Sequence, residues 1–299
     1  MSVIVTATCI SGIKYAGGWQ RLELFAYDQL LHWTERSPLV PPDQPDDRIL
    51  IVGISETDIQ RYGWPLSDET VADLIETIQD HQPRVVGLDL YRSGPQLPGQ
   101  SALAEQLAAD NLVAVRSVGN APSGGDEVPA PASIPPERIG FNDLVVDPDG
   151  VLRRSLLYVG PARGGQYSFA LGIVQRYFPN LDISATADGL MLGNQPIPVL
   201  QSGDGGYQTI DTRGYQQLLH YRHRSEPAQI ISAQEILENR FQPEWIRDKI
   251  VLIGSVAPSL KDQFYTPYSA EQKLDFTQAG VVIHAHIISQ LLAVAEGQP

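Results

Sequence analysis

Four short runs of mostly apolar residues constrain the fold of this chain more than any other feature. They lie at residues 50–54, 85–90, 112–115 and 249–255, and apolar and polar positions do not alternate in any of them. An unalternating run of this length is typical of a strand covered on both faces, as in a parallel sheet. The sequence therefore predicts a sheet with helices on both of its sides.

Helical patterns separate these runs. Ser67 can cap a helix whose first turn carries Asp68 and Glu69 at the positive end of the helix dipole. A second helix is expected near residues 101–109. The resulting β-α-β-α-β order implies right-handed crossovers and parallel strands. We therefore predict an α/β fold with a mostly parallel central sheet flanked by helices, in a three-layer, Rossmann-like arrangement.

The remaining elements add to this sheet without forming a second core. Gly193 and Asn194 lie between apolar residues and predict a β-hairpin insertion. Ser232 and Glu235 have the spacing of a capping box and predict a helix start. The other expected elements are a loop at 120–136, strands at 151–159 and 218–221, a helix at 168–178, the hairpin at 189–199 and a last helix at 280–296.

The N-terminal part predicts a long amphipathic helix followed by a stiff connector. Residues 19–33 carry apolar side chains at helical spacing. Prolines and aspartates then dominate residues 38–47, which is typical of a solvated linker. The apolar stripe of the helix consists of Leu22, Phe25, Ala26, Leu30 and Trp33.

Composition excludes several function classes. The chain has 21 basic and 35 acidic side chains, a formal net charge of −14, so it repels phosphate backbones and nucleic acid is not an expected partner. Its single cysteine, Cys9, excludes an internal disulfide and a cysteine-rich zinc site. The apolar stretch at residues 3–10 is far shorter than the roughly 20 residues of a membrane-spanning helix.

Candidate site residues lie where the predicted strands end, because ligands of open parallel sheets bind beyond the carboxyl ends of the strands. These ends present Ser55, Glu56, Asp89, Arg116 and Ser255. Asp89 is the most informative, since a carboxylate within an apolar strand must be paired, metal-bound or protonated.

Two interpretations of Asp89 remain open. It contributes to a ligand site, or it has a structural role, in which it caps a neighbouring helix or pairs with an arginine such as Arg153 or Arg154. The same choice applies to the turn at residues 147–150, whose aspartates either bind a cation or reverse the chain before the strand with the two arginines.

Catalytic and metal sites have weaker support. Ser255 with His284 and either Asp89 or Asp262 has the composition of a hydrolytic triad, but the chain lacks a Gly-x-Ser-x-Gly elbow at Ser255. His284 and His286 are two positions apart, so on a helix they point roughly 200° away from each other and cannot share one ion. We expect one imidazole to face the core or a pocket and the other to face outward. No glycine-rich nucleotide motif occurs, and no cofactor is expected.

Taken in order along the chain, ten short motifs resemble the second CHASE family, the type-two sensory extracellular domains associated with cyclases and histidine kinases. They span roughly residues 50–292, and the ordered set is more specific than any one of them. Residues 219–222 and 278–280 depart from the usual family patterns. The matching segments are residues 51–58, 63–65, 86–90, 140–142, 147–154, 167–171, 231–232, 249–256, 262–267 and 280–285.

The resemblance implies a periplasmic or extracellular sensory domain of a plasma-membrane receptor, which is not itself an enzyme. It predicts two regions, a juxtamembrane helix with its proline-rich connector at residues 1–44 and the sensory domain at residues 45–299. Residues 3–18 would then be the end of an entering membrane helix, and residues 283–295 would be a helix that leads into the exit span. The output would be a cytoplasmic cyclase, diguanylate cyclase, histidine kinase or Ser/Thr kinase, and the full-length receptor would be a homodimer.

The expected ligand is an unidentified small molecule or ion. Two alternatives are a ligand-free dimerising spacer, with the stripe of residues 19–33 as a parallel seam, and a serine or metal hydrolase. The predicted ligand-binding residues are Ser55, Glu56, Asp89, Asn142, Asp149, Arg153, Ser255, Asp262, Thr266 and His284.

Overall fold

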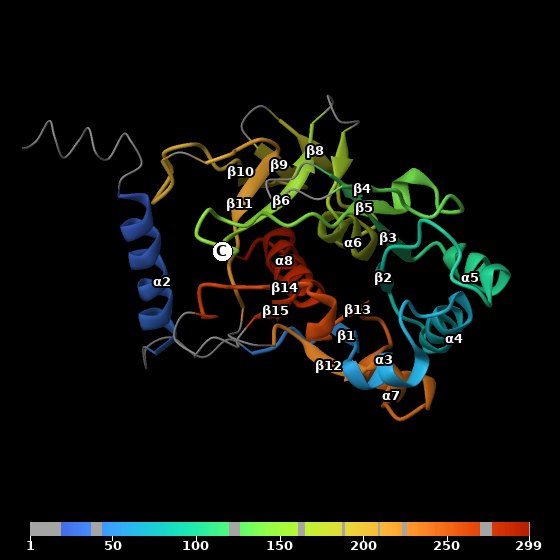
Figure 1. Ribbon diagram of the computed structural model, residues 1–299. Coiled ribbons are helices and arrows are strands. Elements are labelled where there is room, and N and C mark those ends of the chain that lie inside the picture. Colours follow the sequence, from blue (N-terminus) through green and yellow to red (C-terminus); the bar gives the residue numbers. More distant parts are fainter. Residues whose placement is uncertain are drawn as a thin grey trace, which may run out of the picture.

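A mostly parallel sheet forms the centre of the molecule (Figure 1). The computed structural model describes residues 19–36, 44–119, 126–160, 165–186, 189–208, 210–222, 226–269 and 277–298. In this part of the chain the sheet has seven strands in the order β12-β1-β13-β2-β3-β4, with β5 also paired to β3. The strands are β1 (Ile49–Ile54), β2 (Val85–Asp89), β3 (Leu112–Val118), β4 (Glu127–Val128), β5 (Ile139–Phe141), β12 (Gln229–Ser232) and β13 (Ile250–Ser255).

The pairing confirms the predicted α/β class. Strand β1 pairs in parallel with β12 and β13, β13 with β2, and β3 with β2 and β5, whereas β4 is antiparallel to β3. The predicted loop at residues 120–136 therefore contains a short strand, and residues 120–125 lie outside the described part. The closer resemblance to Rossmann-like folds stays a prediction.

Side chains of β1 point alternately to two separate cores. Ile49 and Ile51 pack in one core with α6 (Phe169–Tyr177) and α8 (Gly280–Ala295). Leu50, Val52 and Ile54 lie in the other, with residues of three helices. Helices therefore cover both faces of the sheet, as the unalternating strands predict. The helices of the second core are α4 (Asp68–Gln79), α5 (Gln100–Leu107) and α7 (Ala233–Leu237).

Polar caps fix the helix starts that follow the strands. Ser67 accepts a hydrogen bond from the backbone of Thr70 at the start of α4, and Ser232 forms a capping box with Glu235 at the start of α7, as predicted. Ser55 forms a second capping box, with Asp58, and begins α3 (Glu56–Tyr62), a helix that the apolar pattern does not predict.

Three small sheets lie outside the central one. They have the orders β10-β9-β8, β11-β6-β7 and β14-β15 within the described residues. The predicted hairpin is confirmed, since β9 and β10 pair antiparallel. The bounds are β6 (Arg154–Val159), β7 (Gln166–Tyr167), β8 (Ile183–Ala185), β9 (Gly189–Leu192), β10 (Gln195–Pro198), β11 (Tyr215–Leu218), β14 (Gln263–Phe264) and β15 (Gln278–Ala279).

Two predicted strand boundaries are wrong by three residues. The strand expected at 218–221 is β11, which ends at Leu218, because it pairs antiparallel with β6 from Tyr215 opposite Tyr158 to Leu218 opposite Arg154. The strand expected from residue 151 begins at Arg154, because Val151 instead forms an isolated bridge with Tyr265. Tertiary pairing, rather than apolar pattern, sets both boundaries.

The N-terminal helix α2 (Gln20–Arg36) lies at one side of the α/β body (Figure 1). The large side chains of its apolar stripe are 57–67% exposed, and the buried side chains recur every four residues on another face. Polar groups of the body fix this orientation through Asp28 and His32, as described below. Among the described helices, none is both long and apolar enough to cross a bilayer. The stripe residues are Leu22, Phe25, Leu30 and Trp33, and the buried ones are Gln20, Leu24, Asp28 and His32.

Candidate functional site

A pocket of about 530 Å³ opens at the carboxyl edge of the central sheet. This volume falls in the range of roughly 300–1,000 Å³ that is usual for small-molecule sites. The ends of β2, β3 and β13, the residues after β5 and the first turns of α8 all contribute to it. The lining residues are Trp64, Pro65, Asp89, Leu90, Tyr91, Arg92, Gln96, Ser117, Asn142, Asp143, Leu144, Ser255, Leu260, Lys261, Asp262, Phe264, Gly280 and His284.

Two glycines allow the walls of the pocket to approach each other. Gly254 of β13 lies opposite Asp89 of β2, and a Cβ atom at this position would lie 2.7 Å from Val281. At Gly280, the first residue of α8, a Cβ atom would lie 2.4 Å from a carboxylate oxygen of Asp262. Both contacts are too short for any side chain, so glycine at these positions brings α8 and the Asp262 carboxylate against the sheet edge.

Asp89 is held by an amide rather than by an arginine. The Nδ2 atom of Asn142 donates to Oδ1 of Asp89 at 2.8 Å, and the Tyr91 hydroxyl donates to Oδ1 of Asn142 at 2.8 Å. Burial raises the pKa of Asp89 to about 6, although the hydrogen bond from Asn142 lowers it. The interpretation that Asp89 pairs with Arg153 or Arg154 is wrong, because both arginines bind Asp147.

Asp262 and His284 share the pocket with Asp89. Burial and repulsion by Asp89 raise the pKa of Asp262 to about 6. Burial lowers the pKa of His284 to about 4, although the charge of Asp262 acts in the opposite direction. His284 is 3% exposed, and within the described residues its Nδ1 atom has no hydrogen-bond partner. The imidazole is therefore neutral near pH 7, and one of its nitrogens is unused.

Sequence reasoning missed three charged lining residues, Arg92, Asp143 and Lys261. The Nη1 atom of Arg92 donates to the carbonyl of Leu66 at 2.7 Å, and burial lowers the pKa of Arg92. Its Nε atom has no partner among the described residues. Asp143 accepts hydrogen bonds from Ser117 Oγ and the backbone of Val118, both at 2.9 Å. The sequence signal that was available is their closeness to the family motifs. Arg92 lies two residues after the segment 86–90, Asp143 directly follows the segment 140–142, and Lys261 directly precedes the segment 262–267.

Five of the ten predicted ligand residues meet in this pocket, which brings together segments far apart in the sequence. Their roles as ligand contacts stay a prediction. They are Asp89, Asn142, Ser255, Asp262 and His284.

The other five lie outside the pocket, and three of them serve local structure. Ser55 caps α3. Glu56 accepts hydrogen bonds from the backbone and hydroxyl of Ser259 at 2.8 and 3.0 Å. Thr266 is buried in a turn, where its backbone N–H donates to Ser269 Oγ at 2.8 Å. Ser55 and Glu56 follow β1, and Thr266 follows β14. The pocket is formed instead mainly at the ends of β13, β2, β3 and β5, so these three residues do not reach it.

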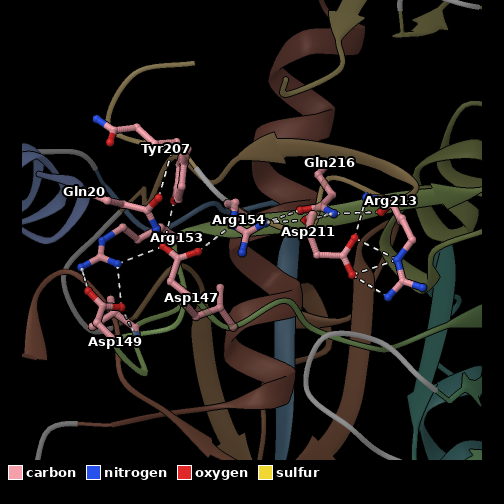
Figure 2. A network of polar contacts seen from close by, with 12 residues as sticks. Gln20, Asp147, Asp149, Arg153, Arg154, Tyr207, Asp211, Arg213 and Gln216 are labelled. Carbon is pink, nitrogen blue, oxygen red and sulfur yellow. Dashed lines mark hydrogen bonds and ion pairs between the residues drawn. The ribbon is translucent and has the colours of Figure 1, made fainter. Parts of the chain in front are cut away.

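The remaining two, Asp149 and Arg153, belong to an ion-pair network between α2 and the body, in which Arg153 is buried and Asp149 lies at the rim (Figure 2). The Arg153 guanidinium donates to both carboxylate oxygens of Asp28 on α2, at 2.8 and 2.7 Å. It also donates to Asp147 at 2.9 Å and to Asp149 at 3.0 and 2.9 Å. The aspartates of the 147–150 turn therefore take an arginine of their own chain as their cation.

Arg154 and Tyr207 complete this network, which we name the junction cluster. Arg154 Nε donates to Asp147 at 2.7 Å, and the Tyr207 hydroxyl donates to the same carboxylate at 2.8 Å (Figure 2). Burial alone would raise the pKa of Asp149, but hydrogen bonds and charge from Arg153 outweigh it and lower the pKa. The junction cluster comprises Asp28, Asp147, Asp149, Arg153, Arg154 and Tyr207.

The prediction that one histidine of the pair faces outward is wrong. His284 lines the pocket, and His286 is 0% exposed on the other side of α8, where its Nδ1 atom accepts from the backbone of Arg222 at 3.2 Å. Both are buried because the sheet covers one side of α8 and the segment after β11 covers the other. No group of three or more His, Cys, Asp or Glu side chains with the geometry of a metal site occurs among the described residues.

The proposed hydrolytic triad is not assembled. Ser255 Oγ accepts a hydrogen bond from the backbone of Ala257 at 3.2 Å. In the described part of the chain it has no hydrogen bond to His284, whose Nδ1 atom is unpartnered. Ser255 thus supports the turn after β13.

Comparison with known proteins gives one match. A family model described as the CHASE2 domain matches residues 5–299, nearly the whole chain. No curated protein and no solved structure matches the chain.

Proposed function

Because the chain belongs to the CHASE2 family of sensory extracellular domains, we propose that it is the ligand-binding input domain of a bacterial transmembrane receptor. The domain lies outside the cytoplasm, and its signal controls a cytoplasmic cyclase, diguanylate cyclase, histidine kinase or Ser/Thr kinase. The observation that carries this proposal is the 530 Å³ pocket, which includes the first turns of α8. Its place at the carboxyl edge is that of ligand sites in three-layer, Rossmann-like folds.

Contacts lead from the pocket to both helices that would continue toward the membrane. Gly280 and His284 place the start of α8 in the pocket wall. The segment that contains Asp262 continues to Pro267, whose carbonyl lies 3.1 Å from Nε2 of His32 on α2. The ring of Tyr268 also packs against His32, with 5.2 Å between centroids. A ligand that contacts Asp262 and His284 thus acts on elements that reach α8 and α2.

Signalling requires that the ligand bind one arrangement of these helices more tightly than another. A small solute that fills the pocket and orders the Asp262 segment would favour one placement of α2 against the body. The cytoplasmic output domain would then respond to a change in the relative positions of α2 and α8.

A thermal-shift screen of a broad library of metabolites and ions tests this proposal. Binding raises the melting temperature in proportion to ligand concentration and affinity. A matched Gln96→Trp variant fills the pocket from a partly exposed position, so we expect it to abolish the shifts. Hydrogen exchange should also slow in α2 and α8 when the ligand is bound. A library without hits, or hits that persist in Gln96→Trp, would contradict the proposal.

A ligand-free dimerising spacer is the second candidate, and the exposed stripe of α2 favours it. Four large apolar side chains on one helix face are typical of a surface that packs against another chain. A Phe25→Glu variant tests this use. Loss of a dimer, measured by light scattering, would support it, and a monomer at every concentration of the unmodified chain would weaken it.

A further inference from the structure

We infer that the ligand of the pocket carries a protonated amine, which Asp89 and Asp262 bind as an ion pair while His284 accepts one of its hydrogens. This inference rests on the input-domain function proposed above and names the chemical class of the ligand.

The pocket holds carboxylates that lack a cation from the chain. Asp89 is bound to the Asn142 amide, and in the described part of the chain neither it nor Asp262 forms an ion pair with arginine or lysine. The charge of Asp89 raises the pKa of Asp262, so a second negative charge in the pocket is costly. Partly buried carboxylates in a pocket of this kind are normally paired. A cationic group supplied by a ligand would be that partner.

His284 provides a second and independent observation. It is buried in the pocket wall, and its Nδ1 atom has no hydrogen-bond partner within the described residues. The other nitrogen, Nε2, forms a hydrogen bond with the backbone of Asn142. This bond raises the pKa of the imidazole, as expected when the ring donates to a carbonyl. In the neutral ring Nδ1 is then an acceptor. An ammonium group, which donates hydrogen bonds and accepts none, matches this atom.

The remaining lining side chains fit an organic cation better than a metal ion. Trp64, Tyr91 and Phe264 supply aromatic faces, which attract cations. The described residues form no group of three ligands that would hold a metal. Of the two basic lining residues, Arg92 has its Nη1 atom on the Leu66 carbonyl.

The other basic residue, Lys261, is exposed, and Arg92 also lies 3.5 Å from Asp68. These two side chains therefore leave the charges of Asp89 and Asp262 unneutralised. Both can contact the carboxylate of an amino acid, which a simple amine lacks. Amino acids and simple amines are therefore compared in the experiment.

The binding experiment uses the protein with butylamine, putrescine, alanine and γ-aminobutyrate, each compared with the form in which every amine is N-acetylated, so that the ammonium charge is removed. Succinate, glycerol, Mg²⁺, Ca²⁺ and Zn²⁺ complete the panel, and the readouts are calorimetry and melting temperature at pH 7.5. We expect at least one free amine to bind saturably and at least tenfold more tightly than its acetylated form. Amino acids that bind more tightly than butylamine would support the inference and add a contact with Arg92 or Lys261.

Two isosteric variants locate the amine. Asp89→Asn and Asp262→Asn should each weaken amine binding at least tenfold, whereas Glu105→Gln, an exposed carboxylate on α5, should leave it unchanged. In the unmodified protein the affinity should also rise as pH increases from 5 to 7.5, since both carboxyls must lose their protons. The other charged groups that face them are Asp143, Arg92 and Lys261, with the Tyr91 hydroxyl.

The outcomes separate this inference from the proposed function. If succinate, glycerol or a metal ion saturates the pocket and no amine does, the amine is excluded while the input-domain function stands. Amine binding that is unaffected by both aspartate variants would place the amine elsewhere and also overturn the inference. If neither this panel nor the broad screen changes the melting temperature, both proposals fail.

Discussion

Two regions of this molecule gather carboxylates, and they surround them with different partners. In the junction cluster Asp28, Asp147 and Asp149 surround Arg153, and all three accept hydrogen bonds from its guanidinium. In the pocket Asp89 and Asp262 meet an amide and one another. In the first region the chain itself supplies arginine partners for the carboxylates, whereas among the described residues Asp89 and Asp262 form no ion pair with arginine or lysine.

The difference shows in the direction of the pKa shifts. Burial acts on carboxyls in both regions, but Arg153 lowers the pKa of Asp149, whereas nothing comparable offsets burial at Asp89 and Asp262, whose pKa values rise to about 6. A paired cluster stabilises one arrangement of α2 and the body. Unpaired carboxylates in a cavity are typical of functional sites, where a ligand supplies the missing charge.

The largest expected effect comes from breaking the junction cluster with Arg153→Met. This substitution leaves Asp28 and Asp149 without their cation and Asp147 with Arg154 alone, and it should lower the free energy of unfolding by about 3–5 kcal/mol. Urea denaturation measures it. Arg213→Gln is the control, because Arg213 pairs with Asp211 at the surface (Figure 2) and its loss should not measurably change stability. A small loss in Arg153→Met would mean that the cluster is solvated.

Asp89→Asn should have the opposite sign. The pKa of Asp89 is about 6 in the folded protein, above its ordinary value of 3.8, so ionisation disfavours the folded state. This cost is absent below about pH 4 and fully present above about pH 6. Because the side chain retains some access to the pocket, we expect the variant to be about 2 kcal/mol more stable at pH 8 and no more stable at pH 4.

Denaturation at both pH values measures the effect of Asp89→Asn. Asp149→Asn is the matched variant from the junction cluster, where the pKa is lowered, and it should reduce stability at pH 8 and lose this effect as the pH falls. If both variants changed the free energy of unfolding at pH 8 in the same direction, the proposed difference between the two regions would be contradicted.

Tyr207→Phe compares the junction cluster with the pocket by removing a single hydroxyl group. The variant removes a hydrogen bond to the buried Asp147 carboxylate and should lower the free energy of unfolding by about 1.5 kcal/mol. Its counterpart in the pocket is Tyr91→Phe. Tyr91 is 48% exposed and donates to a neutral amide, so the loss there should stay below about 0.5 kcal/mol. Thermal denaturation of both variants is the measurement, and a reversed order would contradict the assignment.

The smallest effect is expected for Asn142→Ala. The amide of Asn142 lowers the pKa of Asp89, so its removal should raise that pKa further above 6. A carboxyl titration by NMR follows the change. Asn180→Ala, an exposed position outside the pocket, should leave the titration unchanged. An unchanged or lower pKa of Asp89 in Asn142→Ala would show that the hydrogen bond does not form.

The sequence determined the local features of this fold because they depend on residues close together in the chain. Unalternating apolar runs predicted β1, β2, β3 and β13, and the Ser67 cap and the Ser232–Glu235 capping box predicted two helix starts. The same reasoning predicted that Asp89 and Ser255 end strands at one edge of the sheet, since parallel strands present their carboxyl ends together.

Which side chains form ion pairs and hydrogen bonds with each other could be seen in the tertiary structure alone. Asp28 and Arg153 are 125 positions apart in the chain, and no local pattern indicates that they meet. The apolar stripe of α2 predicted a face but not its direction, and the ion pair with Arg153 turns that face outward. In the same way, α8 buries both histidines because two distant segments cover it. Pairing between residues so far apart in the chain depends on how the elements pack in three dimensions. Local sequence patterns do not report this packing.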